Sequence, residues 1–380
     1  MDMAKEFRDR LDRTQQVMQN KGLDALIAYS DQWRWGHVKY LSNFRVLTFN
    51  ADGTMWTPTL VLVPTKGEPT LFVPDNEVYL AEPVSYIKNI KTIKGGYIGS
   101  ISDMATELKR FRDSAHPRRI ALEGLNLMPV TMYRTIEQCF PGVSLEAIPI
   151  LTDLRGIKSK WEIEMLEKVS HITDDSIMAG IHAIKEGVTE REISNAMHKS
   201  ILDANSELSF GPLVGTGSRS AREVGGFPGD YKVRRGDFVL LDVGGVYEGY
   251  TGDLTRGASL GKLSKEYRDI VNVVIEGWKK AQSTARVGAT VAEINKASHT
   301  VVEEAGYGKY FPHEVVHGLG LEIEEPPFLP DTVIKEGMTF VVECAIYYEN
   351  KMGLRLEDML AVTESGTKRL CKLDPDPPEL

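Results

Sequence analysis

Acidic residues interrupt apolar, strand-like runs in the second half of the chain, and this limits what the chain can fold into. In LLDVGGVYEGYTGDLTR, Asp242 ends an apolar run and Asp253 lies 11 positions later. An unpartnered carboxylate buried in such a run costs several kcal/mol to desolvate. Asp242 alone is compatible with a strand end facing the turn at Gly244. A hairpin turning near Gly249, however, would bring both carboxylates to one side of a sheet.

Two further acids occupy similar positions, Glu343 within TFVVECAIYY and Glu357 within GLRLEDMLAV. Four carboxylates in strand-like segments cannot all ionise in a low-dielectric core unless positive charge compensates them. Divalent metal would supply that charge, and one imidazole would complete a mixed oxygen and nitrogen ligand set. HEVVHGLGLEIEE offers His313 and His317 for this purpose, although a histidine is also often purely structural.

Length and charge narrow the class of protein. A chain of 380 residues favours two domains. Its net charge of −9 argues against nucleic acid as a partner. Three cysteines without close spacing favour a reducing compartment. The start of the chain lacks the apolar core of a signal peptide, and no run approaches the roughly 18 apolar residues of a membrane helix. We therefore expect a cytoplasmic protein without a membrane partner.

The pattern of elements changes near residue 156. Before it, strand-like runs such as TLVLVP, TLFVP and RIALEG alternate with helix-like DMATELKRFRD and VTMYRTIEQCF, which predicts a smaller α/β domain over 1–156. Beyond it, FVLLDVGG, YTGDLTR, MTFVVECAIYY and GLRLEDMLAVT are strand-like and joined by glycine turns, which predicts an α+β domain over 157–380. Its proline-rich end, DPDPPEL, is expected to fray.

Capping boxes predict where three helices of the second domain begin. In each, a serine or threonine is followed three positions later by a glutamate, ahead of apolar residues at helical spacing. The pairs are Ser159 with Glu162, Thr189 with Glu192, and Thr290 with Glu293.

Together, these motifs resemble the pita-bread metallopeptidases: methionine aminopeptidase, aminopeptidase P, prolidase and the related creatinase. The resemblance covers nearly the whole chain, including the linker LRGIKSKWEIEMLEKVS of the creatinase and prolidase branch. It implies a creatinase-type N-terminal domain over 1–156 and a pita-bread catalytic domain over 157–380.

The resemblance also implies a dinuclear metal centre with five protein ligands. By this resemblance, two of them, Asp253 and Glu357, would bridge the metal ions. Asp242 would bind one ion, and His317 and Glu343 would bind the other. Mn, Co, Fe and Zn all suit such a site, and two such ions polarise a substrate carbonyl and activate water.

Three further positions match residues near the substrate in the aminopeptidase P and prolidase branch. His313 matches a substrate-contacting histidine, Arg355 an arginine beside the metal carboxylates, and Tyr347 a tyrosine of the same strand as a glutamate ligand. A surface histidine, a structural ion pair and a packed tyrosine are the alternatives.

The sequence departs from the family pattern where two histidines are usual. Glu324 stands at one position and Gly225 at the other. Glu324 would take over proton transfer if burial raised its pKa, or it would attract a cationic group of the substrate. Cys344 and Ala345 replace the usual Pro-Gly after the first glutamate ligand, which is expected to shift the local geometry.

The expected activity is metal-dependent hydrolysis of a C–N amide bond, with Xaa-Pro dipeptides as the first substrates to test. One alternative is a creatinase-like hydrolase or a lyase acting on a small non-peptide substrate. Another is a non-catalytic binding member of the fold. The family architecture further implies a homodimer acting on a short peptide or small molecule.

Overall fold

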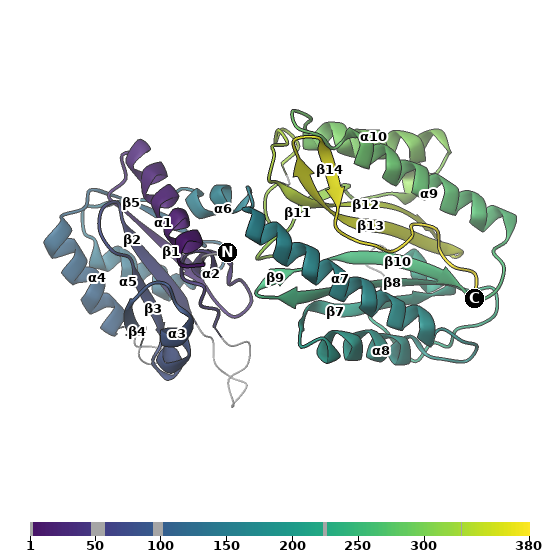
Figure 1. Ribbon diagram of the computed structural model, residues 1–380, viewed down its shortest axis with the longest axis horizontal. Coiled ribbons are helices and arrows are strands. Elements are labelled where there is room, and N and C mark those ends of the chain that lie inside the picture. Colours follow the sequence, from purple (N-terminus) through teal and green to yellow (C-terminus); the bar gives the residue numbers. More distant parts are fainter. Residues whose placement is uncertain (1–2, 47–57, 94–101, 223–225, 328) are drawn as a thin grey trace. The chain divides into compact units, whose positions relative to one another are not determined.

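The chain folds into two compact units, Met1–Arg155 and Gly156–Leu380, in a computed structural model. The structure describes residues 3–46, 58–93, 102–222, 226–327 and 329–380 (Figure 1). Among these residues, no helix is both long and apolar enough to cross a membrane.

The first unit is a six-stranded mixed sheet with helices, in the strand order β4-β3-β2-β1-β5-β6. Central strand β1 runs antiparallel to β2 and parallel to β5. The bounds are α1 Met3–Asn20, β1 Ala25–Ser30, α2 Gly36–Ser42, β2 Thr59–Pro64, β3 Thr70–Pro74, η1 Asp75–Glu77, α3 Val78–Val84, β4 Asn89–Ile93, α4 Ser102–Ala115, β5 Arg119–Glu123, α5 Val130–Cys139, β6 Ser144–Ala147 and α6 Ile150–Arg155.

One core of this unit lies between the sheet and helices α4 and α5. Alternate residues of β1, Ala25, Ile27 and Tyr29, share a buried cluster with Met104 of α4 and Met132 of α5. Because side chains alternate across a strand, these three residues belong to one face of the sheet. The expected combination of helices and strands in this part of the chain is confirmed.

The second unit holds two sheets, in the orders β10-β8-β7, with β9 paired to β8, and β11-β12-β13-β14. The bounds are α7 Lys160–Ala183, α8 Glu190–Asp203, β7 Glu207–Thr216, η2 Gly217–Ala221, β8 Phe238–Tyr247, β9 Tyr250–Thr251, β10 Leu254–Ser259, α9 Lys265–Thr284, α10 Val291–Glu304, η3 Gly308–Tyr310, β11 Val316–Gly318, β12 Thr339–Tyr348, β13 Met352–Thr363 and β14 Gly366–Arg369.

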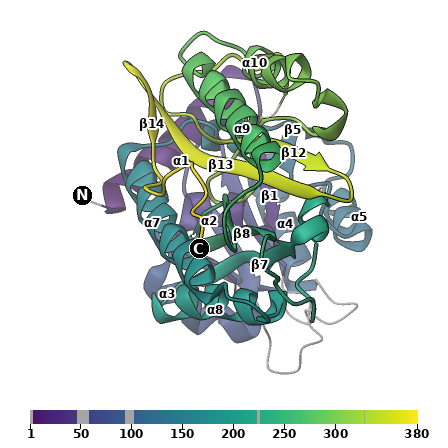
Figure 2. The same cartoon turned by 90° about the vertical axis from the view of Figure 1, so that its right-hand side faces the viewer.

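Helices cover both sheets of this unit from outside. Helices α7 and α8 lie against β8 and β7, while α9 lies against β12 and β13, and the two sheets adjoin where β10 lies beside β13. Figures 1 and 2 show the two helix pairs on opposite sides of the strands. This α+β arrangement places the strands that carry the acidic residues in the middle of the unit.

All three predicted capping boxes are present. The side chains of Ser159, Thr189 and Thr290 each accept a hydrogen bond from the backbone N–H three residues later, at the starts of α7, α8 and α10. Each box is completed by the glutamate side chain, which accepts a hydrogen bond from the N-cap backbone N–H. The helices that flank the sheets therefore begin where local sequence chemistry sets them.

The structure corrects two expectations about strands and ends. YTGDLTR is not one strand, because Gly252 and Asp253 separate β9 from β10. Gly252 packs so closely that an added Cβ would lie 2.5 Å from Thr173 Oγ1.

The residues after β14 do not fray either. The Ser259 N–H donates to Pro378 O at 3.0 Å, and the Leu380 N–H donates to Ser259 O at 2.9 Å. Arg268 also donates to Glu379 Oε1 at 2.6 Å. These contacts align the end of the chain with β10.

Candidate metal centre

Strand pairing brings the four acidic residues of the sequence motif together. Glu343 of β12 lies directly opposite Glu357 of β13. Asp242 of β8 lies opposite Thr255 of β10, and Asp253 immediately precedes β10. Since β10 lies beside β13, one sheet presents the aspartates next to the glutamates of the other sheet.

His317 lies among three of these carboxylates. Its Nε2 atom is 3.8 Å from Asp253 Oδ2, 3.8 Å from Glu343 Oε1 and 3.8 Å from Glu357 Oε1. Its Nδ1 atom is 3.1 Å from the backbone oxygen of Ile323. A carbonyl oxygen only accepts, so Nδ1 carries a hydrogen, and Nε2 is the ring nitrogen that points toward the carboxylates.

The distances among these groups suit a cation better than direct hydrogen bonds. Ligand atoms of Asp253, His317 and Glu357 all lie within 4.8 Å of one another. A backbone carbonyl that fixes the ring through Nδ1 is the usual outer partner of a metal-binding histidine. The sequence did not reveal this partner, Ile323.

Arg355 joins the remaining carboxylate to the cluster. Its Nη2 donates to Asp242 Oδ2, and its Nε donates to Thr255 Oγ1 at 2.9 Å. The Thr255 hydroxyl in turn donates to Glu357 Oε2 at 2.6 Å. The second oxygen of Asp242, Oδ1, is buried with no hydrogen-bond partner among the described residues.

Burial disfavours the ionised form of all four acids. Desolvation raises the pKa of Asp242 to about 7, against the opposing effect of the Arg355 guanidinium. It raises the pKa of Asp253 well above its usual range, and the neighbouring charges of Glu357 and Asp242 raise it further. Desolvation is also the main cause of the raised pKa values of Glu343 and Glu357.

The site therefore has too little positive charge to balance its carboxylates. One guanidinium cannot neutralise three buried carboxylates and the partly buried Glu343, and Asp242 Oδ1 has a lone pair directed at no donor in the described chain. Carboxylates with one imidazole are ligands that borderline divalent ions prefer. The residues present thus fit divalent metal ions.

A directed chain of hydrogen bonds leads from Arg355 toward the edge of the cluster. Arg355 Nη1 donates to the Tyr347 hydroxyl at 2.9 Å, and this hydroxyl lies 3.0 Å from His313 Nε2. His313 Nδ1 is 2.8 Å from the backbone oxygen of Glu314 and must donate to it, which leaves Nε2 as an acceptor. Burial raises the pKa of Tyr347, so it stays protonated and donates to His313.

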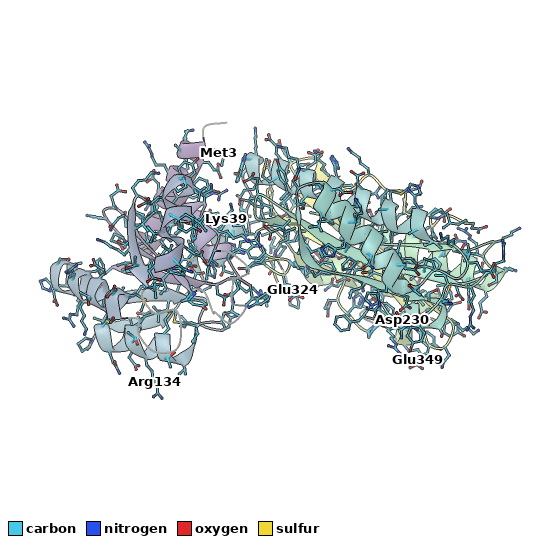
Figure 3. The ribbon with its side chains drawn as sticks, turned by 90° about the horizontal axis from the view of Figure 1, so that it is seen from below. Met3, Lys39, Arg134, Asp230, Glu324 and Glu349 are labelled. Carbon is cyan, nitrogen blue, oxygen red and sulfur yellow. The ribbon has the colours of Figure 1, made fainter. Side chains whose placement is uncertain are left out.

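Glu324 is not buried, although its expected role in proton transfer depended on burial. It is exposed, although its charge helps to raise the pKa of Glu343, so it lies near the cluster. Figure 3 labels Glu324 at the surface. Its neighbour Glu325 is the buried residue, and it accepts a hydrogen bond from Lys158 Nζ at 2.7 Å. The burial on which the expected proton-transfer role of Glu324 depended is therefore absent.

The other departures from the family pattern have different outcomes. Gly225 lies outside the described residues. Cys344 and Ala345 continue β12 in regular pairing with β13. Cys344 is fully buried and faces Gly277 of α9, where an added Cβ would lie 2.7 Å from its sulfur. This stretch is therefore regular strand in the present chain.

Fold and site together define a carboxylate-rich metallohydrolase centre on a pita-bread domain. The model of metallopeptidase family M24 matches residues 164–364, and that of the creatinase/prolidase N-terminal domain matches residues 10–157. The chain belongs to metallopeptidase family M24. The resemblance found in the sequence, the fold class and the expectation of a metal-dependent peptidase are thereby confirmed.

The chain is similar to known relatives and to solved structures over most of its length. The Xaa-Pro dipeptidase of Pyrococcus furiosus is 32% identical over 329 residues, covering 79% of this chain and 94% of that protein. A prolidase structure from Thermococcus sibiricus has a TM-score of 0.86 at 26% identity, with 100% of each chain covered. The prolidase structure from Pyrococcus furiosus has a TM-score of 0.79 at 30% identity, covering 95% of this chain and 99% of that one.

Proposed function

We propose that the protein is an Xaa-Pro dipeptidase-like metallohydrolase with two divalent ions. The main support is the position of His317, whose Nε2 lies 3.8 Å from oxygens of three carboxylates contributed by two sheets. The Xaa-Pro dipeptidase and prolidases to which the chain is similar suggest the substrate class.

The proposed ligands are Asp242, Asp253, His317, Glu343 and Glu357. The family resemblance implies that Asp253 and Glu357 would be shared by the two ions, and each has an oxygen 3.8 Å from His317 Nε2. Asp242 would bind one ion through Oδ1, the oxygen that Arg355 leaves without a donor. When bound, the metal ions supply Lewis-acid polarisation of the scissile carbonyl and activation of water.

The protein's own contribution to catalysis is proposed to come from the Arg355, Tyr347 and His313 chain. Arg355 holds Asp242 and the Thr255 hydroxyl, and it orients the Tyr347 hydroxyl toward His313. His313 is partly exposed. Its Nε2 can accept the hydrogen bond of the Tyr347 hydroxyl, or the ring can contact substrate directly. For catalysis the Tyr347 hydroxyl would turn its single hydrogen from His313 to the developing oxyanion.

The exposed Glu324 supports a second candidate function. In it, the protein hydrolyses a small non-peptide substrate or cleaves it in a lyase reaction. An exposed carboxylate stands near Glu343, where peptidases of this branch usually carry a neutral imidazole. Its negative charge is suited to attracting a cationic group. A creatinase-like reaction on such a substrate is the alternative to dipeptide cleavage.

Metal stoichiometry and dipeptide cleavage, measured on the same samples, test the proposal. We expect close to two metal ions per chain by plasma mass spectrometry and metal-dependent cleavage of Xaa-Pro dipeptides. Asp253→Asn should lose both. Asp230→Asn is the matched control, because Asp230 is exposed and bonds only to Arg191 among the described residues, at 3.1 Å.

Each outcome separates the candidates. Two ions with no cleavage of any dipeptide would favour the non-peptide reaction. No metal after reconstitution with Mn, Co, Fe or Zn would refute the dinuclear centre and leave a binding role. A homodimer in the cytoplasm is also proposed from the family architecture, and sedimentation of the purified chain tests the dimer.

A further inference from the structure

Arg256 lies behind the candidate metal centre. It follows Thr255 in β10, and Asp358 follows Glu357 in β13. Because successive side chains of a strand point to opposite faces, Thr255 and Glu357 meet on the side of the cluster, while Arg256 and Asp358 meet on the other side. Arg256 is 3% exposed, so water cannot substitute for its partners.

The Arg256 guanidinium uses its full set of five N–H donors. Nη1 donates to Thr255 O at 2.9 Å and to Glu357 O at 2.7 Å. Nη2 donates to Asp358 Oδ1 at 2.5 Å and to Leu373 O at 3.2 Å. Nε donates to Asp374 O at 3.2 Å. Two of these acceptors are backbone oxygens of residues whose side chains enter the metal cluster.

Arg369 provides a natural comparison, because it shares some of these partners. Its Nε donates to Asp358 Oδ2 at 2.6 Å, and its Nη2 donates to Leu373 O. Among the residues that the structure describes, none of its hydrogen bonds reaches Thr255 or Glu357. The two arginines therefore differ in the feature that matters here, the contact with the strands that bear the ligands.

We propose that Arg256 is a positioning residue for the metal centre. By binding Thr255 O and Glu357 O with one planar group, it fixes β10 and β13 at the spacing at which Asp253 and Glu357 would both reach the proposed ions. The 2.6 Å bond between the Thr255 hydroxyl and Glu357 Oε2 requires the same spacing. This inference rests on the proposed dinuclear centre and adds to it a residue that touches neither metal nor substrate.

The test is a titration of the metal-free full chain with MnCl2 in three variants. Arg256→Lys keeps the charge beside Asp358 but loses the planar set of donors. Arg256→Gln is a second variant, in which Asp358 keeps its hydrogen bond from Arg369 Nε. Both should weaken Mn²⁺ binding by about 10- to 100-fold, the usual effect of losing an outer partner of a metal site. Arg369→Lys should change it by less than about 3-fold.

Spin coupling between two bound Mn²⁺ ions is a second measurement, and a general loss of stability does not change it. At saturating Mn²⁺, the electron paramagnetic resonance spectrum of Arg256→Lys should show altered coupling, while Arg369→Lys should match wild type. Equal binding by all variants, or equal weakening in Arg369→Lys, would overturn the proposal. So would failure of both Arg256 variants to fold, since Arg256 would then support the whole unit. If wild type binds no Mn²⁺, the metal centre itself fails.

Discussion

Removing metal should reverse the pH dependence of the stability of the second unit, and Asp242 allows the size of the effect to be worked out. Its pKa is about 7 in the folded chain, because burial disfavours the carboxylate. The same group has a pKa of about 3.9 when unfolded. A raised folded pKa means that the folded state binds more protons than the unfolded state between these two values.

The sign of the effect follows directly. The stabilising contribution of protonated Asp242 is fully present below about pH 4 and is lost as the pH rises through about 7. Each pH unit between the two pKa values removes about 1.4 kcal/mol. From pH 5 to pH 8, metal-free protein should therefore lose about 2 to 3 kcal/mol of unfolding free energy through this residue. Bound metal should reverse the trend, since its ligands must be deprotonated.

The unfolding free energy of the second unit can be measured by urea unfolding in the presence of chelator. Hydrogen exchange of peptides from β8 and β13 monitors the unfolding of this unit. Asp242→Asn does not titrate, so the difference between wild type and variant reports Asp242 together with its effect on the pKa values of Asp253 and Glu343. The wild-type minus variant difference should fall by about 2 to 3 kcal/mol between pH 5 and pH 8. A difference that stays constant or rises over this range would refute the assignment of a buried, proton-binding Asp242.

Three further substitutions test other contacts of the second unit. Tyr347→Phe removes the hydroxyl held by Arg355 and should lower kcat/KM for the cleaved dipeptide roughly 100-fold while metal content stays the same; unchanged kinetics would exclude a role for the hydroxyl. Gly353→Ala would place a Cβ 2.1 Å from Ser220 O and should cost about 1 to 3 kcal/mol in urea unfolding, whereas an unaltered midpoint would contradict this packing. Thr290→Ala should cost about 1 kcal/mol by loss of the α10 cap, and Tm should fall accordingly; an unchanged Tm would show that the cap is dispensable.

Features set by neighbouring residues could be predicted from the sequence. The capping boxes at Ser159, Thr189 and Thr290 form within a few residues of each helix start, so local chemistry decides them. The acids Glu343 and Glu357 were recognisable because carboxylates are rare in apolar strands. Their direct pairing across β12 and β13 confirms that they share a place in the sheet.

Features set by distant residues could not be predicted in this way. Lys158 and Glu325 form a buried pair across 167 positions, and neither stands out in its own segment. Thr255 fits any strand pattern, and only the fold brings it to Glu357. Arg256 looks like an ordinary charge after a strand until the backbone oxygens around it are known. In each case the partner is chosen by tertiary packing.

The division of the acids between two sheets has a mechanical consequence. Asp242 belongs to β8 and Asp253 immediately precedes β10 of the same sheet, while Glu343 and Glu357 belong to the sheet of β12 and β13. Any ion held by both pairs acts as a cross-link between the sheets and closes a long loop of chain, much as a disulfide does. Removal of the metal would then first separate β10 from β13, where the two sheets adjoin, while each sheet stayed intact. The carboxylates proposed to bind the ions would then also stabilise the fold through them.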